Sequence, residues 1–481
     1  MESKQIAEIV SSPENKERIS RERKRYNVYH GGLRDYIKDA IYSEFKRKGT
    51  VEQLVNRIVP LNITQKIINR LAKVYLTQPQ RSPMDELPSD EDAIDLLNPA
   101  LELSTNMLDA NRYFKLSKHF CLEPYAHRGA PRLRVLAAHN YTPASNDVVD
   151  STFPTHIVKH LRWGTHDKNA LHVVWSDDEH YLMNGLGDKL LMPENPEGKN
   201  PYGVNPLIYV RSQKDSLIPI EDDDLIYMQM AICLLLTDMN FASKFKLWNL
   251  IYIIGLKSQL VDFNPNQILF LPKDKDGESP EVGTIESRFD SDAMLRQVQG
   301  LVSMLLSTKQ LKAQEMQAVT IQNAASGIAK MLDTAESTED KVEQQNYFVE
   351  AEKKLFEVLK KQLPVWDEQG LLEGKFKALR LSDDFILQTR FPMPKAIQSE
   401  KETVETEKSK LEAGFTTHDR SLAVVNSDLT PQELEELKIQ IEKESKVKQQ
   451  KQADEMKKNM PENKSKMPKE GMNGEEIDLE A

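Results

Sequence analysis

The chain has 481 residues, of which 39% are hydrophobic, and a formal net charge of −11. A chain of this length can bury a sizeable core, and we expect two or three structural units. The net negative charge argues against a protein that grips nucleic acid over its whole surface, although DNA that only passes nearby remains compatible with it. The two cysteines, Cys121 and Cys233, have no CxxC partner, which excludes a disulfide framework or a zinc knuckle and indicates an intracellular protein.

Neither a membrane span nor a signal peptide is expected. The longest apolar run, residues 225–236, is interrupted by Gln229 and is shorter than the roughly 18 to 20 residues that a membrane span needs. The first ten residues lack the apolar core of a signal peptide. We therefore expect no membrane partner.

Residues 1–50 are expected to form a helical N-terminal arm. Ser12 followed by Pro13 is a helix start, and the helix should continue to the glycines at 31–32. Its basic run, residues 21–25 (RERKR), is interpreted as a solvated helix face, with a phosphate or capsid contact as the alternative.

A β-rich unit is expected in the middle of the first half. Helices are predicted at residues 63–76 and around 96–121, and from 131 to 211 short apolar runs alternate with turn residues. Within this unit, residues 175–180 (WSDDEH) should form a hairpin turn, and residues 193–206 a long loop rich in proline and glycine.

Two helices should bracket a small β element. Residues 222–224 offer an N-cap and negative charge for a helix over 225–247 that is apolar nearly all round. Strand-like runs follow at 250–256 and 266–272. A second helix should begin at Asp290 or Ser291 and carry an apolar stripe of Met294, Val298, Leu301 and Leu305.

The remainder of the chain should be helical with polar breaks. Residues 309–325 are polar and rich in glutamine, whereas 326–363 carry apolar residues at heptad-like spacing up to Pro364. At about 1.5 Å per residue such a helix would exceed roughly 50 Å. Capping boxes predict further helix starts at Ser399 and Thr430, and the charged tail from about residue 447 is too poor in apolar residues to pack alone.

No motif for catalysis or phosphate binding by a glycine-rich loop is present, namely GxxxxGK[ST], GxGxxG, GxSxG or HExxH. Five histidines lie within 25 residues, and His156 with His160 could form a minimal metal pair, but we favour surface or satisfied histidines. The acidic run 221–224 is read as a helix cap rather than a Mg²⁺ site. We therefore expect no catalytic residue, metal or cofactor. The five histidines are His156, His160, His166, His172 and His180.

Four segments in order resemble the portal proteins, the head-to-tail connectors of tailed bacteriophages. In chain order they are NPYGVNPLIYVR (200–211), IPIEDDDLIYMQMAICLLLTDMNFASKF (218–245), SGIAKMLDTAE (326–336) and EAGFTTHDRSLAVVNSDLTPQELEE (412–436). The similarity extends from about residue 51 to about residue 443.

The resemblance implies an α+β fold, mainly helical with a β-rich wing and a small α/β clip, assembled as a ring around a central channel. It divides the chain into an N-terminal arm, a first wing part, a stem helix, a clip, a second stem helix, a tunnel loop, a second wing part containing the helix 326–363, and a crown helix with a disordered tail. The corresponding residues are 1–50, 51–220, 221–248, 249–287, 288–308, 309–325, 326–428 and 429–481.

The implied function is structural: the channel through which a terminase packages double-stranded DNA and through which the DNA is later ejected. The implied partners are other copies of the chain in a ring, usually of twelve, together with the terminase large subunit, the major capsid and scaffold proteins, a head-tail connector, and DNA transiently in the channel. The protein would be part of the virion at the portal vertex and would occupy the host cytoplasm during assembly. No enzyme activity of its own is implied.

The resemblance also assigns candidate site residues. The tunnel loop would present Lys309, Gln310, Lys312, Gln314 and Gln317 to DNA. From the residues alone, Lys309 and Lys312 are first read as a solvated helix end. The junction from the loop into the long helix would be Ala325, Ser326 and Gly327, where small residues suit a crowded ring interior and glycine tolerates backbone angles that others do not.

Two alternatives remain open. A metal-dependent hydrolase would use His156, His160 and a nearby carboxylate. A coiled-coil adaptor built on residues 326–363 would explain the heptads but not the β-rich unit.

Overall fold

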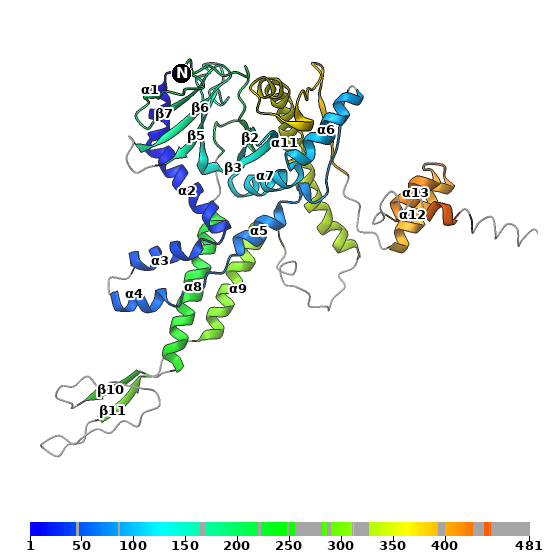
Figure 1. The fold of residues 1–481 in the computed structure, drawn as a ribbon. Helices are drawn as coiled ribbons and strands as arrows, with labels where there is room; N and C mark the ends of the chain where they lie inside the picture. Colours follow the sequence, from blue (N-terminus) through cyan, green and yellow to red (C-terminus); the bar gives the residue numbers. More distant parts are fainter. Residues whose placement is uncertain are drawn as a thin grey trace, which may run out of the picture. The chain divides into compact units, whose positions relative to one another are not determined.

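The computed structural model describes residues 1–44, 48–84, 87–163, 169–219, 223–247, 250–254, 281–285, 290–309, 311, 327–392, 400–426, 437–441 and 443. Contacts divide the chain into two compact units, Met1–Met393 and Pro394–Ala481. The described part of the first unit combines helices with antiparallel sheets, so the fold is mixed helix and sheet as expected (Figure 1).

Helices dominate the first seventy residues, and their starts follow local capping chemistry. The side chain of Ser12 accepts a hydrogen bond from the backbone N–H of Asn15, and Pro13 is the first helical residue of α2, which confirms the predicted start. The first helix packs against a sheet, so the N-terminal segment is part of the unit's core. The helices are α1 (Ser3–Ser11), α2 (Pro13–Tyr29), α3 (Leu33–Glu44), α4 (Lys48–Val55) and α5 (Ile63–Leu71).

Two predicted helices differ from the structure in their bounds. The helix predicted at 63–76 ends at Leu71, and a 3₁₀ turn follows over Val74–Leu76, because the buried side chain of Asn111 accepts a hydrogen bond from the N–H of Val74. The helix predicted around 96–121 is two helices, α6 (Pro88–Ala100) and α7 (Leu103–Ser117), separated at Glu102, whose φ is +47°.

A three-stranded sheet and the long helix α11 (Gly327–Glu368) enclose the main core of the first unit. The strand order is β3 (Ala130–Leu136), β2 (His119–His127), β9 (Ile208–Arg211), so the β-rich unit begins at His119 rather than at 131. Aromatic side chains from this sheet, α7 and α11 meet there, and the ring of Phe120 stacks on that of Phe348 with centroids 5.6 Å apart.

A five-stranded sheet is covered by the N-terminal helix. Ile6 and Val10 of α1 are buried against the sheet, and Gly187, with φ +86°, approaches α1 so closely that a Cβ would lie 2.8 Å from Lys4 Cα. The predicted turn at 175–180 and loop at 193–206 are confirmed. The strands, all antiparallel and in this spatial order, are β4 (Tyr141–Ala144), β5 (His156–Arg162), β6 (Leu171–Trp175), β7 (His180–Asn184) and β8 (Lys189–Leu190).

The apolar residues of the described part of α11 face the chain's own core. Of the heptad positions, Phe356 and Leu363 are buried together with Phe348, Leu355 and Leu359, whereas Val342 is 46% exposed. This stripe packs into the core of the same chain, which removes the basis for a coiled-coil adaptor. The helix also continues through Pro364 to Glu368, because burial of the residues around the proline offsets one lost backbone hydrogen bond.

A buried carboxylate ties a small sheet to α11. The side chain of Glu352 on α11 accepts hydrogen bonds from Tyr75 Oη at 2.8 Å, from Arg81 Nη2 at 2.7 Å and from Thr389 Oγ1 at 2.8 Å. Arg81 and Thr389 belong to the two-stranded sheet of β1 (Gln80–Pro83) and β12 (Leu387–Arg390). The network therefore joins segments that lie about 300 positions apart in the chain.

The second unit contains a helical hairpin. Helix α12 (Glu400–Glu412) begins where the capping box predicted, and Gly414, with φ +73°, follows its C-terminal end. The N–H of Phe415 donates to the carbonyl of Lys410, which closes the helix end in the usual glycine-terminated manner. Helix α13 (His418–Val425) follows and is capped by the side chain of Thr417. The predicted start at Thr430 lies outside the described residues.

Candidate functional site

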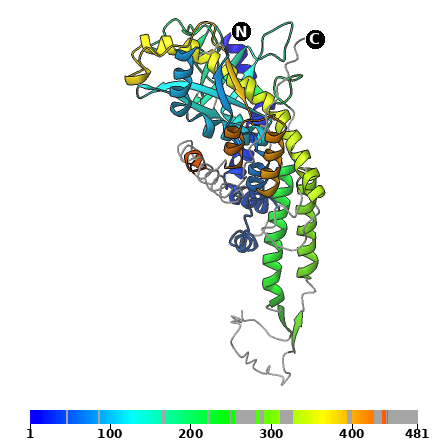
Figure 2. The same ribbon diagram turned by 90° about the vertical axis from the view of Figure 1, so that its right-hand side faces the viewer.

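The two helices that should bracket a small β element form an antiparallel pair, α8 (Asp224–Leu247) and α9 (Ser291–Thr308). Strand β10 (Leu250–Ile254) directly follows α8 and pairs with β11 (Glu281–Ile285), which precedes α9. Both views show α8 running from the rest of the first unit to this two-stranded ribbon (Figures 1 and 2). Of the two predicted strands, 250–256 is confirmed as β10, whereas 266–272 lies outside the described residues.

Ion pairs connect residues at the upper end of this pair, which is the end formed by the start of α8 and the end of α9. Lys309, directly after α9, forms an ion pair with Asp224, the first residue of α8, with Nζ 2.8 Å from Oδ1. The preceding residue, Asp223, pairs with the guanidinium of Arg25 on α2. The acidic run thus supplies negative charge at a helix start, as expected, and pairs with cations from two other helices.

Gln229 connects α8 to the start of α5. Its side-chain carbonyl accepts hydrogen bonds from the backbone N–H groups of Ile63 at 2.8 Å and Thr64 at 2.9 Å, and its amide donates to the carbonyl of Leu61. These N–H groups begin α5 and have no partner within the helix. Gln229, which interrupts the apolar run of α8, is fully buried and caps a neighbouring helix.

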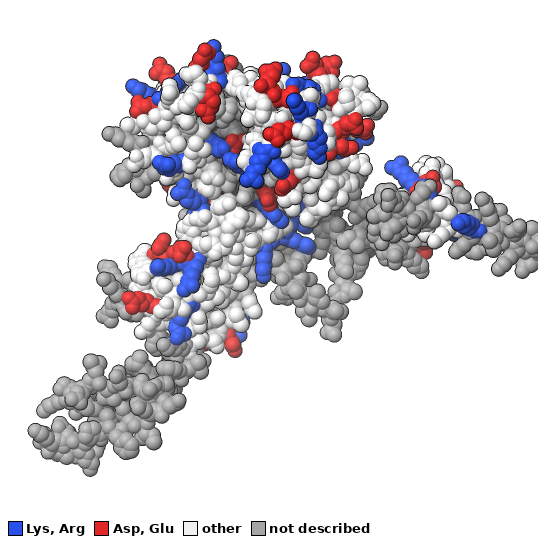
Figure 3. Space-filling model, viewed as in Figure 1, with Lys and Arg blue, Asp and Glu red and all other residues white. Residues whose placement is uncertain are grey.

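The outer faces of the pair carry exposed apolar side chains among polar ones. Tyr227 on α8 is 64% exposed, and on α9 Leu295 is 44% and Met304 is 59% exposed. The space-filling view shows charges of both signs interspersed over the upper part of the first unit and few charges along the helix pair (Figure 3). Among the described residues, apolar side chains of both helices of the pair are therefore accessible at the surface.

Among the described residues, one helix is long and apolar enough to span a bilayer. It is α8, whose segment Asp224–Ser243 has a mean hydropathy of 1.5 and is 39% buried. A core helix of a soluble protein also meets these criteria, so a single helix of this kind is weak evidence for a membrane span.

The predicted tunnel-loop residues are described only at their boundaries. Lys309 directly follows α9 with its side chain 17% exposed, and Gly327 is the first residue of α11, whose predicted range began at residue 326. The other predicted site residues lie outside the described part of the chain: Gln310, Lys312, Gln314, Gln317, Ala325 and Ser326.

The histidine group is largely engaged by hydrogen bonds inside the five-stranded sheet. His160 Nε2 lies 2.9 Å from Thr142 Oγ1, and its Nδ1 lies 2.9 Å from His172 Nδ1, so both ring nitrogens of His160 have partners. Burial lowers the pKa of His172 to about 4 and that of His160 well below its usual value. His156 sits on the same strand with Nδ1 against Thr155 Oγ1.

Nowhere in the described ranges do three His, Cys, Asp or Glu side chains gather closely enough to hold a metal ion. His166, one of the five histidines, lies outside those ranges. The hydrolase interpretation therefore gains no support from the geometry of His156 and His160.

A buried polar stripe on α2 was missed by the sequence interpretation of the basic run. Arg21 is exposed as expected, but Arg25 is buried and lies 2.6 Å from Glu22, which is itself fully buried. Burial raises the pKa of Glu22, and the adjacent Arg25 opposes that rise. The spacing of residues 15, 18, 22 and 25 was the available signal, because these positions share one face of a helix.

Comparison with known proteins leaves the family unassigned. No protein-family model and no curated protein matches the sequence. Among solved structures, the chain is similar to one described as "Neck of empty GTA particle computed with C6 symmetry", with a TM-score of 0.34 and 11% sequence identity. The alignment covers 79% of this chain and 94% of that chain. A TM-score this low does not establish a shared fold.

Proposed function

We propose that this protein is the portal of a tailed-phage capsid, a structural ring through which double-stranded DNA is packaged and later ejected. The observation that carries the proposal is the antiparallel pair of α8 and α9, joined at its far end by the ribbon of β10 and β11. This is the stem-and-clip order that the portal resemblance implies for residues 221–308.

The surface of the helix pair supports an assembly of several copies. A helix as apolar as α8 that is only 39% buried over Asp224–Ser243 leaves apolar area for another chain. Exposed apolar residues on α9, such as Met304, add to the same surface. In the proposed ring, usually of twelve copies, neighbouring pairs cover one another and line the channel.

The net charge of −11 fits a conduit better than a DNA-holding protein. A strongly basic wall would bind the phosphate backbone and impede sliding. We propose transient DNA contacts at the residues after α9, beginning with Lys309, and docking of the terminase and of the head-tail connector at the clip. In this proposal the protein carries out no reaction of its own and belongs to the virion vertex.

The test combines electron microscopy of the purified full-length protein with two matched variants. Met304→Asp places a charge on the exposed face of α9 and is expected to abolish ring formation while leaving the thermal unfolding midpoint nearly unchanged. Leu191→Asp makes the same change at a residue that is 82% exposed in the loop after β8 and is expected to leave rings intact.

Equal ring formation by both variants would contradict the assignment of the helix pair to the subunit interface. Stoichiometric zinc, manganese or iron in the purified protein would contradict the proposal that the protein carries out no reaction and would favour a metal-dependent hydrolase at His156 and His160.

A further inference from the structure

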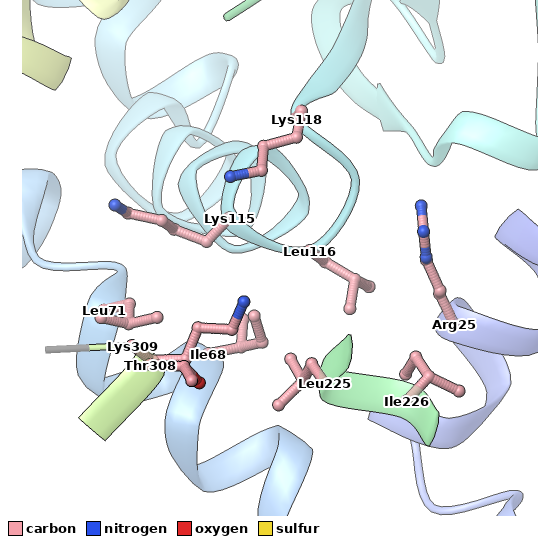
Figure 4. A pocket seen from close by; sticks show the side chains of 10 residues that line it. All are labelled: Arg25, Ile68, Leu71, Lys115, Leu116, Lys118, Leu225, Ile226, Thr308 and Lys309. Carbon is pink, nitrogen blue, oxygen red and sulfur yellow. The ribbon is translucent and has the colours of Figure 1, made fainter. Parts of the chain in front are cut away.

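A small pocket opens at the upper end of the α8–α9 pair, where five helices meet. Its volume is about 160 Å³, and it lies between α2, α5, the start of α8 and the C-terminal ends of α7 and α9 (Figure 4). This volume holds several water molecules but is below the roughly 300 Å³ at which pockets for drug-sized ligands begin. The pocket therefore suits one small ion or a single group of a larger ligand.

Cationic side chains dominate the polar lining. Four of the ten lining residues are basic, namely Arg25, Lys115, Lys118 and Lys309, and none of the ten is acidic. Figure 4 shows the side chains of Lys115 and Lys118 extending from the end of α7 and that of Lys309 from the end of α9. The apolar lining residues are Ile68, Leu71, Leu116, Leu225 and Ile226.

The basic residues differ in how firmly the protein holds them. Arg25 is 2% exposed and is bound by Glu22 and Asp223, which fixes it as a permanent positive charge at one side of the pocket. Lys309 pairs with Asp224 but keeps 17% of its side chain accessible. Lys118, the residue that caps α7, is exposed and can turn its ammonium group toward a ligand.

We propose that this pocket binds one phosphate group, held by the ammonium groups of Lys115, Lys118 and Lys309. Each ammonium group donates up to three hydrogen bonds, and lysines bind phosphate as point charges. A tetrahedral oxyanion offers enough acceptors for all three.

The phosphate group has two possible sources, a free phosphate ion and the backbone of duplex DNA. The chemistry of recognition is the same in both cases. Because the pocket lies within a single chain, phosphate binding there does not depend on ring formation, so it can be tested independently of the portal proposal.

The test titrates the full-length protein with inorganic phosphate at constant ionic strength, using chloride as the reference anion. The variant combines Lys115→Gln, which keeps a good helix former, with Lys118→Asn, which suits the left-handed backbone of Lys118 at φ +62°. The control combines Lys353→Gln with Lys361→Gln, which removes the same charge from exposed positions of α11.

Phosphate is expected to raise the unfolding midpoint of the wild type and of the control more than chloride does. The pocket variant is expected to bind phosphate at least about tenfold more weakly per lysine removed. Equal binding by the pocket variant and the control, or no preference of the wild type for phosphate over chloride, would overturn the proposal.

A second arm measures binding of a short DNA duplex by fluorescence anisotropy with the same variants. Weaker phosphate and duplex binding by the pocket variant alone supports the DNA backbone as the source. Weaker phosphate binding with unchanged duplex binding supports a free phosphate ion. If neither ligand distinguishes the pocket variant from the control, the pocket is not a phosphate site.

Discussion

The ammonium group of Lys309 lies 2.8 Å from the carboxylate of Asp224, which joins the end of α9 to the start of α8. Lysine after a helix C-terminus and aspartate in a first helical turn each interact favourably with the helix dipole, so this ion pair stabilises both helix ends at once. It connects the two helices at one end of the pair, while the pairing of β10 with β11 connects them at the other end.

We expect a measurable coupling between Asp224 and Lys309 in a double-mutant cycle of Asp224→Asn and Lys309→Gln. Because both side chains are partly exposed, the coupling free energy should be about 0.5 to 1 kcal/mol and should decrease with added salt. Urea denaturation of the four proteins measures it. The more exposed pair of Lys189 and Glu179, 3.5 Å apart, should couple less, and equal coupling would contradict the role given to the first pair.

Replacing Glu352 should be strongly destabilising. Glu352→Gln removes the charge that pairs with Arg81, whose side chain is 4% exposed, and leaves a buried cation without its carboxylate. We expect a loss of about 3 to 5 kcal/mol in the free energy of unfolding, measured by urea denaturation.

Its control is Glu350→Gln, two residues earlier on the same helix. The side chain of Glu350 is 47% exposed and pairs with Lys214 and Lys354 at the surface, so the expected loss is below about 1 kcal/mol. Similar losses in the two variants would show that the buried network is not what stabilises this region.

Loss of the Gln229 side chain should weaken the start of α5. Gln229→Leu keeps the apolar packing of α8 but leaves the N–H of Thr64 without its acceptor and removes one of the two acceptors of the N–H of Ile63. The expected cost is about 1 to 3 kcal/mol, with faster hydrogen exchange at these two amides. Gln297→Leu, at an exposed position of α9, should change stability by less than about 0.5 kcal/mol and is the matched control.

Stability should fall in mild acid because several histidines are buried in the neutral form. The pKa of His172 is about 4 in the folded protein and 6.5 in its ordinary state, so the unfolded chain takes up the proton first as the pH falls. The contribution of His172 to the free energy of unfolding is fully present above about pH 6.5 and is lost progressively between pH 6.5 and 4. Each such histidine contributes up to about 1.4 kcal/mol per pH unit.

The measurement is the free energy of unfolding between pH 8 and 4 for the wild type and for His172→Gln. Below pH 6.5 the free energy of unfolding of the variant should fall less steeply with decreasing pH than that of the wild type, by a slope that corresponds to the uptake of up to one proton. Between pH 7.5 and 8 the two curves should be parallel. An unchanged slope in the acid range would show that His172 is not buried as described.

Local signals predicted most of the elements of the fold. Ser12 and Pro13, the capping box at Ser399 and the aspartates before α8 and α9 all mark real helix starts, because capping depends only on neighbouring residues. The hairpin turn after Trp175 was likewise evident from adjacent turn residues.

Features that depend on distant residues could not be predicted in this way. The helix after Ile63 ends early because the side chain of Asn111, from another helix, binds Val74. The buried role of Arg25 depends on Asp223, almost 200 positions away in the sequence. The heptad-like spacing of α11 did not identify the packing partner, because an apolar spacing does not tell whether the partner is another chain or the chain's own sheet.

The candidate site was predicted only in part. The helices on both sides of the small β element lie side by side as expected, whereas the ion pair of Lys309 with Asp224 was not predicted. The pocket formed with Lys115 and Lys118 could not be anticipated, because it arises only when the ends of α7 and α9 come together.

The most direct test of the central claim is native mass spectrometry of the purified full-length chain, with negative-stain electron microscopy of the same sample. The account expects a closed assembly of one defined subunit number whose class averages show a ring with a central hole. A protein that stays monomeric and shows no ring across a wide range of concentration and salt, and with scaffold protein added, would contradict it.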